Sequence, residues 1–163
     1  MEDTISQAKA EFIRAKDDLA RALATTPDDR INWSPSPTSR TPVQIVAHAA
    51  AAVKNIHNFL TGQPFGFDNA ADADRSFREW EQRFTTREQV NSLLDQSSGA
   101  FVAWLDTVTQ EQLSEMIELP FGLGSAPRSV ALTFPAAHTR SHVPQIEYIQ
   151  TIYGDRDWHM PGK

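Results

Sequence analysis

The sequence predicts an all-α protein in which four amphipathic helices pack around one shared apolar interior. Apolar residues recur at steps of three and four in four long segments, which is the period of one face of an α-helix. Segments rich in proline, glycine and small polar residues separate these stretches and cannot continue a helix. Amphipathic helices joined by loops bury their apolar faces against one another, so a helical bundle is expected.

Composition narrows the class of protein. With 163 residues, of which 40% are hydrophobic and 22% charged, the chain is expected to form a single domain over residues 1–163. It has no apolar stretch of membrane-spanning length, and its acidic N-terminus lacks the features of a secretory signal, so we expect a cytoplasmic protein with no membrane segment. The net charge of −6 argues against general nucleic-acid binding. Because cysteine is absent, a metal ion would have to be bound by His, Asp or Glu.

The first helix is predicted over residues 4–25. The segment 27–42 follows and holds four prolines, so it should be an irregular loop, with Trp33 pinning it to the rest of the protein. The apolar face of the first helix consists of Ile5, Ala8, Phe12, Ala15, Leu19, Ala22 and Leu23.

The second helix is predicted from Thr41 to Leu60. Thr41 stands three residues before Gln44 and directly before Pro42, which matches a capping box with proline at the first helical position. Gly62 and a proline two residues later predict its C-terminal end.

A long connection over residues 66–84 should contain a short helix at residues 75–83. Thr85 and Glu88 form a second capping box and predict the start of the third long helix. Its apolar stripe has the clearest helical period in the chain and consists of Val90, Leu93, Leu94, Ser97, Phe101, Trp104, Leu105 and Val108.

The remaining chain should hold a short helix from Thr109, a loop or small hairpin over residues 117–124, and a last long helix over residues 130–153 that ends at Gly154. Pro135 and Pro144 predict either a late start or a kink in this helix. The tail, residues 155–163, should be ordered only if it docks on the bundle.

His138 and His142 are the first candidates for a functional site. They are four residues apart in the last helix, so both imidazoles lie on one face, about 6 Å apart along the axis, and can reach one ion. The residues predicted to share this core-facing side are Phe134, Gln145, Ile149 and Ile152. For this spacing alone, two core histidines satisfied by hydrogen bonds are an equally good interpretation.

His48 shifts the balance toward a metal. It shares a face of the second helix with Ile45, Ala52, Asn55 and Phe59. Three imidazoles would then point to one interior, where their nitrogens cannot all satisfy one another, whereas a divalent cation takes one lone pair from each. We therefore predict that His48, His138 and His142 bind one zinc or nickel ion with an open coordination position.

The other histidines fit this site less well. His57 lies on the opposite side of the second helix from His48, and His159 lies in the tail. Arg140 should face solvent or a partner. The segment from His138 to His142 lacks the glutamate of HExxH metalloproteases, so a peptidase is not expected.

These histidines stand in motifs that resemble the DinB-like superfamily, also called the DinB/YfiT-like metalloenzymes. The motifs are Asn32-Trp33-Ser34-Pro35, His48 within Val46-Ala-His-Ala-Ala, and His138-Thr-Arg-Ser-His142-Val-Pro-Gln145 with the helix that follows. The resemblance implies an up-down-down-up four-helix bundle, a metal bound by His48, His138 and His142, and a homodimer. Pro144 stands where members of the family commonly have glycine; it removes a backbone donor and can bend the helix just beyond His142.

The resemblance also implies a function. Relatives include transferases and isomerases that use low-molecular-weight thiols such as bacillithiol or mycothiol, so a metal-dependent thiol S-transferase acting on a small electrophile is the first hypothesis. Gln145 and Asn55 are candidates for contacts to the ligands or substrate, because they share the faces of the histidines. A noncatalytic metal-binding or stress-associated dimeric bundle is the second hypothesis, and a metal-free dimerisation module is the third.

Overall fold

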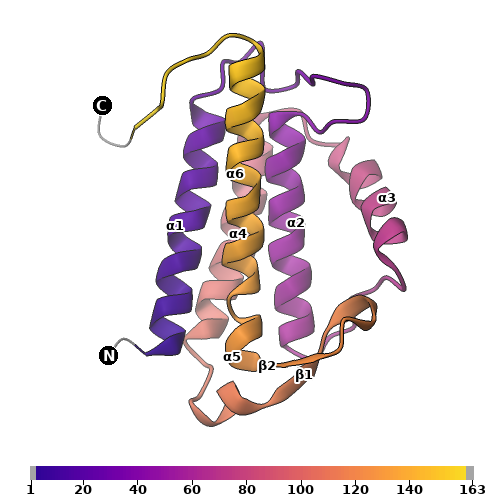
Figure 1. Ribbon diagram of the computed structural model, residues 1–163, viewed down its shortest axis with the longest axis vertical. Coiled ribbons are helices and arrows are strands. Elements are labelled where there is room, and N and C mark those ends of the chain that lie inside the picture. Colours follow the sequence, from indigo (N-terminus) through magenta and orange to yellow (C-terminus); the bar gives the residue numbers. More distant parts are fainter. Residues whose placement is uncertain (1–2, 161–163) are drawn as a thin grey trace.

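The computed structural model describes residues 3–160 and shows a four-helix bundle (Figure 1). Its helices are α1 (Thr4–Ala24), α2 (Pro42–Leu60), α4 (Arg87–Leu105) and α6 (Phe134–Ile152). Along the chain, α1 runs up, α2 and α4 run down, and α6 runs up (Figure 1). The predicted all-α class and the up-down-down-up order are therefore confirmed.

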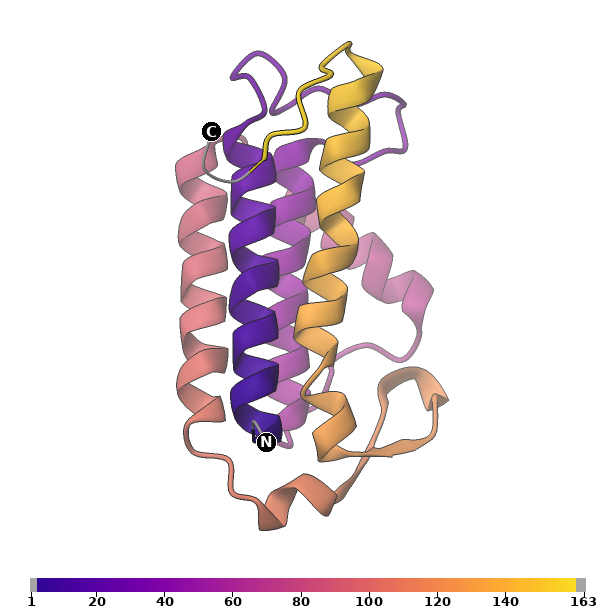
Figure 2. The same cartoon turned by 60° about the vertical axis from the view of Figure 1, so that its left-hand side comes forward.

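The four helices form a closed ring of neighbours. Helix α1 packs against α4 on one side and α6 on the other, and α2 also packs against both α4 and α6 (Figure 2). Helices α2 and α6 are antiparallel neighbours, so residues far apart in the sequence face each other across this pair.

The second and third bundle helices run in the same direction, so the chain must return along the bundle between them. Helix α3 (Ala70–Glu81) makes this return on the outside of α2 (Figure 1). It begins earlier than the predicted range of 75–83, because Asn69 caps it by accepting a hydrogen bond from the backbone N–H of Asp72. Only Ala73 and Glu81 of this helix are buried, which explains why an apolar period did not predict its start.

The helix starts show where capping motifs predict well and where they do not. The capping box of Thr41 and Gln44 is confirmed. The box predicted at Thr85 and Glu88 is wrong by one residue, because Thr86 is the N-cap and Gln89 is its partner. The sequence allows two capping boxes one residue apart, Thr85 with Glu88 and Thr86 with Gln89, and only tertiary packing selects between them.

The chain between α4 and α6 crosses the lower end of the bundle in short elements (Figure 1). The predicted short helix is the 3-10 turn Glu111–Ser114, and the predicted hairpin is confirmed. Strand β1 (Met116–Glu118) pairs antiparallel with β2 (Ser125–Pro127), and the 3-10 turn Pro120–Gly122 lies at the hairpin tip.

The last helical segment is interrupted near its start. A short helix α5 (Arg128–Ala131) is separated by Leu132 and Thr133 from α6, so the predicted late start is confirmed. Pro144 lies inside α6, which nevertheless remains one continuous helix as far as Ile152. His138 and His142, the two candidate ligands of α6, therefore lie on continuous helical backbone.

The core extends along the whole bundle. Near the lower end, the fully buried rings of Phe12 and Phe101 meet edge to face with centroids 4.9 Å apart. At the upper end, Trp33 contacts Tyr153 edge to face, which holds the proline-rich loop against the end of α6 as predicted. Among the described residues, no helix is long and apolar enough to cross a membrane.

Candidate metal centre

The three histidines singled out by the sequence lie together between α2 and α6. His48 comes from α2, and His138 and His142 come from successive turns of α6. Each offers one ring nitrogen, and these three nitrogens lie within 4.8 Å of one another. The ring centroids are 4.7 to 5.3 Å apart. The expected convergence of imidazoles from two helices is therefore present.

The site lies at the edge of the bundle core, which differs from the sequence prediction. We expected the face with Gln145 and Ile152 to be the buried face of α6, but Gln145 is exposed and Ile152 is 46% exposed. The buried stripe of α6 is rotated, because α6 packs against both α1 and α2; it runs through Thr139, Val143, Ile146 and Gln150. His138 and His142 consequently lie where the core meets the α2 and α3 side.

Glu81 orients the ring of His48. His48 Nδ1 lies 2.7 Å from Glu81 Oε1, and the Glu81 side chain is 1% exposed. Arg40 donates from Nε to the other carboxylate oxygen of Glu81 at 2.6 Å. Sequence analysis missed Glu81, because neither its spacing nor its neighbours distinguish it from the exposed acidic residues around it. Only the packing of α3 on α2 brings it to His48.

Further ion pairs hold this arrangement in place. Arg40 also contacts Asp74 at 3.0 Å, and Asp74 accepts a hydrogen bond from Arg78 at 2.7 Å. Burial raises the pKa of Glu81, but its hydrogen bonds and charge interactions with His48 and Arg40 outweigh burial and leave this pKa below its ordinary value. Glu81 is therefore a carboxylate at neutral pH, so His48 carries its ring proton on Nδ1 and donates it.

Gln145 orients the second ring. His142 Nδ1 lies 2.8 Å from Gln145 Oε1, which agrees with the predicted role of Gln145 beside a candidate ligand. Asn55, the other candidate, instead lines a separate cavity between α2, α3 and α4, and the prediction for it is wrong. Asn55 lies on the same face of α2 as His48 only approximately. Helix α3 lies between the cavity that contains Asn55 and the pocket beside His48.

These contacts decide which ring nitrogens are free. With Nδ1–H of His48 and His142 directed at oxygen acceptors, the lone pair of each ring is on Nε2. The Nε2 atoms of His138 and His142 lie 3.0 Å apart. The three imidazoles therefore bring one ring nitrogen each into a volume small enough for a single cation.

Burial keeps the two imidazoles of α6 neutral. Burial is the main cause that lowers the pKa of His138 to about 3, with smaller contributions from the neighbouring positive groups. Burial also lowers the pKa of His142, against a hydrogen bond to Gln145 that raises it. Neutral imidazole is the form that binds metal ions, so at neutral pH these rings need lose no proton before coordination.

A pocket of about 540 Å³ adjoins the histidines. His48 and His138 form part of its wall, and the remaining wall comes from α2, the connection between α2 and α3, α3, the start of α6 and the hairpin tip. The histidine group is thus accessible from one side, which an ion with an exchangeable coordination position would need.

The remaining histidines stay outside the group, as predicted. His57 packs between helices near Phe101 and Trp104, with ring centroids 6.0 and 5.4 Å away. His159 contacts Asp155 at 2.9 Å in the C-terminal segment. Arg140 is exposed. Residues 161–163 of the predicted tail lie outside the described residues.

A family model of the DinB superfamily matches residues 11–146, a range that contains all three histidines. The chain belongs to the DinB superfamily. This agrees with the resemblance carried by the histidine motifs. No curated protein matches the chain.

Several solved structures share this DinB-type fold. The structure of DfsB, described as a sibling lethal factor precursor, has a TM-score of 0.75 at 14% identity, covering 96% of this chain and 100% of that chain. YfiT from Bacillus subtilis, described as a probable metal-dependent hydrolase with an unusual four-helix bundle topology, has a TM-score of 0.71 at 18% identity, covering 93% and 89%. A DinB-like protein from the same organism has a TM-score of 0.64 at 20% identity, covering 93% and 94%. At these identities the likeness shows the fold alone.

Proposed function

We propose that His48, His138 and His142 bind one divalent metal ion, zinc or nickel, and that the protein is a metal-dependent transferase acting through a low-molecular-weight thiol. The observation that carries this proposal is the convergence of three imidazoles, two of which are oriented by acceptors at Nδ1. Hydrogen-bonded second partners of this kind accompany metal-binding histidines in most proteins that use them.

The donor set fits a borderline-soft divalent cation. Without an ion, the facing Nε2 atoms of His138 and His142 can share at most one proton, and His48 adds a third ring to the same small volume. Three histidines leave a fourth position for an exchangeable ligand. When bound, such an ion makes a coordinated thiol, or a coordinated water molecule, much more acidic, so that it can act as a nucleophile at neutral pH.

The chain's own residues supply orientation and shelter. Glu81 holds the His48 ring, and the pair of Arg40 with Asp74 holds Glu81. Gln145 holds the His142 ring. The pocket beside His48 and His138 gives room for a second substrate next to the candidate ligands.

Hydrolysis is the second candidate function, because the structurally similar YfiT is described as a probable metal-dependent hydrolase. The same open position would then serve water in place of a thiol. A noncatalytic metal-binding bundle is the third outcome. We also propose that the protein forms a homodimer and works in the cytoplasm, in line with the family resemblance.

Metal quantification on the purified protein tests the site. We expect about one zinc or nickel per chain in the wild type and a near-complete loss in His48→Ala, because two imidazoles on one helix hold an ion far more weakly than three. His57→Ala is the matched control, since it removes a histidine of the same helix that lies outside the group, and it should retain the metal. Equal metal content in His48→Ala and the wild type would refute the site.

Activity assays then distinguish the functions. The metal-loaded wild type is mixed with a thiol and chlorodinitrobenzene, and separately with activated esters without thiol. Thiol transfer that is lost in His48→Ala supports the transferase, and ester hydrolysis alone supports the hydrolase. Absence of both reactions in protein that binds one metal ion per chain would leave the noncatalytic bundle.

A further inference from the structure

The pocket beside the histidines has an unusual wall. Apart from His48 and His138, Asp74 is the only polar side chain among residues 3–160 that lines it. The other lining side chains are alanine, proline or large apolar residues, and the large ones include Ile56, Phe59, Phe65, Phe121, Leu123 and Phe134. The pocket volume of about 540 Å³ lies within the range typical of sites for small molecules, roughly 300–1,000 Å³.

No unbalanced charge faces this space among the described residues. Asp74 is held by Arg40 at 3.0 Å and by Arg78 at 2.7 Å, so its negative charge is already compensated. Neither arginine lines the pocket. An anion would therefore find no cationic partner there, and a cation would compete with two arginines for Asp74, so a charged ligand would be desolvated without compensation.

Aromatic rings connect the hairpin tip to the histidines. Phe121 meets Phe65 edge to face at 5.2 Å, Phe65 meets Phe67 at 6.1 Å, and Phe67 meets Phe77 at 5.3 Å. The ring of Phe77 in turn lies edge to face with His48 at 5.5 Å. Phe121, Phe65 and Phe77 line the pocket itself, and Phe67, which lines the neighbouring cavity, connects Phe65 to Phe77 through its ring contacts.

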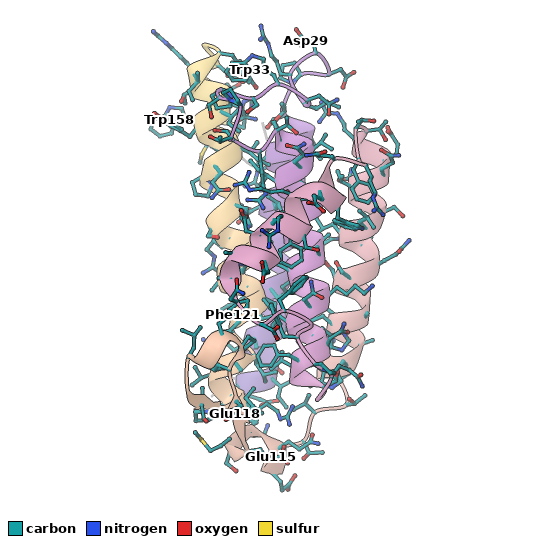
Figure 3. The ribbon with its side chains drawn as sticks, turned by 90° about the vertical axis from the view of Figure 1, so that its right-hand side faces the viewer. Asp29, Trp33, Glu115, Glu118, Phe121 and Trp158 are labelled. Atoms are coloured by element: carbon teal, nitrogen blue, oxygen red, sulfur yellow. The ribbon has the colours of Figure 1, made fainter. Side chains whose placement is uncertain are left out.

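The hairpin tip lines the outer rim of the pocket. Figure 3 shows Phe121 at the tip, next to the lower end of α3. Phe121 has φ 62° and ψ 23°, a left-handed conformation that non-glycine residues seldom adopt. Phe121 and Leu123 remain 37% and 72% exposed although both line the pocket. Backbone strain and exposed apolar surface at one rim are typical of a ligand-binding loop.

We infer that this pocket binds an uncharged, largely apolar molecule carrying an aromatic or branched aliphatic group, next to His48 and His138. Resting on the proposed function, this molecule would be the electrophilic substrate, because low-molecular-weight thiols with charged or sugar groups do not match the apolar wall. The thiol then binds on the side of the histidines, and the apolar electrophile binds on the side of Phe121.

A matched pair of fluorescent probes tests the inference on the full-length protein. N-phenyl-1-naphthylamine is uncharged, and 8-anilino-1-naphthalenesulfonate has the same ring system with an added sulfonate. We expect saturable binding of the uncharged probe, one molecule per chain, and about tenfold weaker binding of the sulfonate, because its charge has no partner in the pocket.

Two variants locate the probe. Ala137→Phe adds a ring at an exposed α6 position that lines the pocket, and we expect it to weaken binding of the uncharged probe about tenfold or more by filling the space. Phe121→Ala removes part of the rim and should weaken binding about threefold or more. The controls are Val130→Phe and Met116→Ala, which alter exposed apolar residues nearby that do not line the pocket, and both should bind like the wild type.

The result of the probe experiment does not depend on whether the metal site is correct. Probe binding is measured on metal-loaded and on chelator-treated protein, and melting curves show that each variant is folded. Absence of binding, binding unaffected by Ala137→Phe, or preference for the sulfonate would overturn the inference, whether or not metal is bound. So would sedimentation data in which Phe121→Ala dissociates a dimer and only the monomer binds the probe, because the rim would then be an interface between copies.

Discussion

The side chain of Glu81 joins three separate parts of the chain. It belongs to α3 and contacts Arg40 of the proline-rich loop and His48 of α2. A buried carboxylate is costly unless it is paired and hydrogen-bonded, and both of its oxygens have partners here. The Glu81 carboxylate has a role beyond packing, because its contact with His48 sets which nitrogen of the His48 ring carries the proton.

We expect Glu81→Gln to weaken metal binding by about tenfold to a hundredfold, because a neutral amide holds the His48 ring less firmly and makes it a poorer donor. The dissociation constant is measured by competition with a chromophoric chelator. Glu79→Gln is the matched control, since it changes an exposed glutamate of the same helix and should leave the constant unchanged. Unaltered affinity in folded Glu81→Gln would restrict Glu81 to a structural role.

At the scale of elements, α6 carries most of the site and contains an unfavourable residue. Pro144 has no N–H to donate to the carbonyl of Arg140, yet α6 continues to Ile152. The missing hydrogen bond would span residues 140–144, so the helical turn that lacks it contains His142 and begins two residues after His138. The family's more common glycine would supply that N–H but would make the backbone more flexible.

Pro144→Ala is expected to stabilise the protein by about 1 kcal/mol, because alanine restores a helical hydrogen bond and is a good helix former. Part of this gain is offset, because the unfolded chain becomes more flexible without the proline. Urea denaturation measures the free energy of unfolding. Glu147→Ala, at an exposed position of the same helix, should change it by less than about 0.5 kcal/mol. Destabilisation by Pro144→Ala would mean that the proline supports the observed backbone.

At the scale of the whole molecule, the aromatic contact of Phe12 with Phe101 and the histidine site lie in different parts of the bundle. The core contact of Phe12 and Phe101 lies between α1 and α4, whereas the histidines lie between α2 and α6. A change in either region should therefore leave the local contacts of the other intact, as long as the bundle stays folded.

Phe12→Ala should lower the free energy of unfolding by roughly 3–5 kcal/mol, because it leaves a cavity at a fully buried position and removes the edge-to-face contact with Phe101. The adjacent Ile13→Ala is the control, and it should cost much less because Ile13 is 40% exposed. Chemical denaturation of both variants makes this comparison. Similar losses in the two would contradict the assigned orientation of α1.

Removal of the metal should lower the melting temperature of the wild type, since an ion that binds only the folded state stabilises it by mass action. His48→Ala should show little further shift on chelation, whereas His57→Ala should respond like the wild type. If neither chelation nor added zinc or nickel changes the melting temperature of the wild type, a metal-free bundle with histidines at the edge of its core is favoured.

The sequence by itself predicted the four long helices and the three candidate histidines. Helical period, proline loops and the capping box at Thr41 depend on residues close together in the chain, so they can be predicted without knowing the fold. The spacing of His138 and His142 belongs to the same class of local information. The order of the helices came from the resemblance to the DinB superfamily, because amphipathic periodicity contains no direction of packing.

Only the tertiary structure decided what surrounds these histidines. Glu81 is 33 residues from His48 in the chain, and its contact depends on how α3 crosses α2. The rotated core face of α6, the choice of Thr86 as a cap and the apolar pocket under Phe121 likewise depend on packing between distant segments. The physical reason is that a residue's local spacing restricts which face it occupies, whereas its partner across that face is set by the arrangement of the whole bundle.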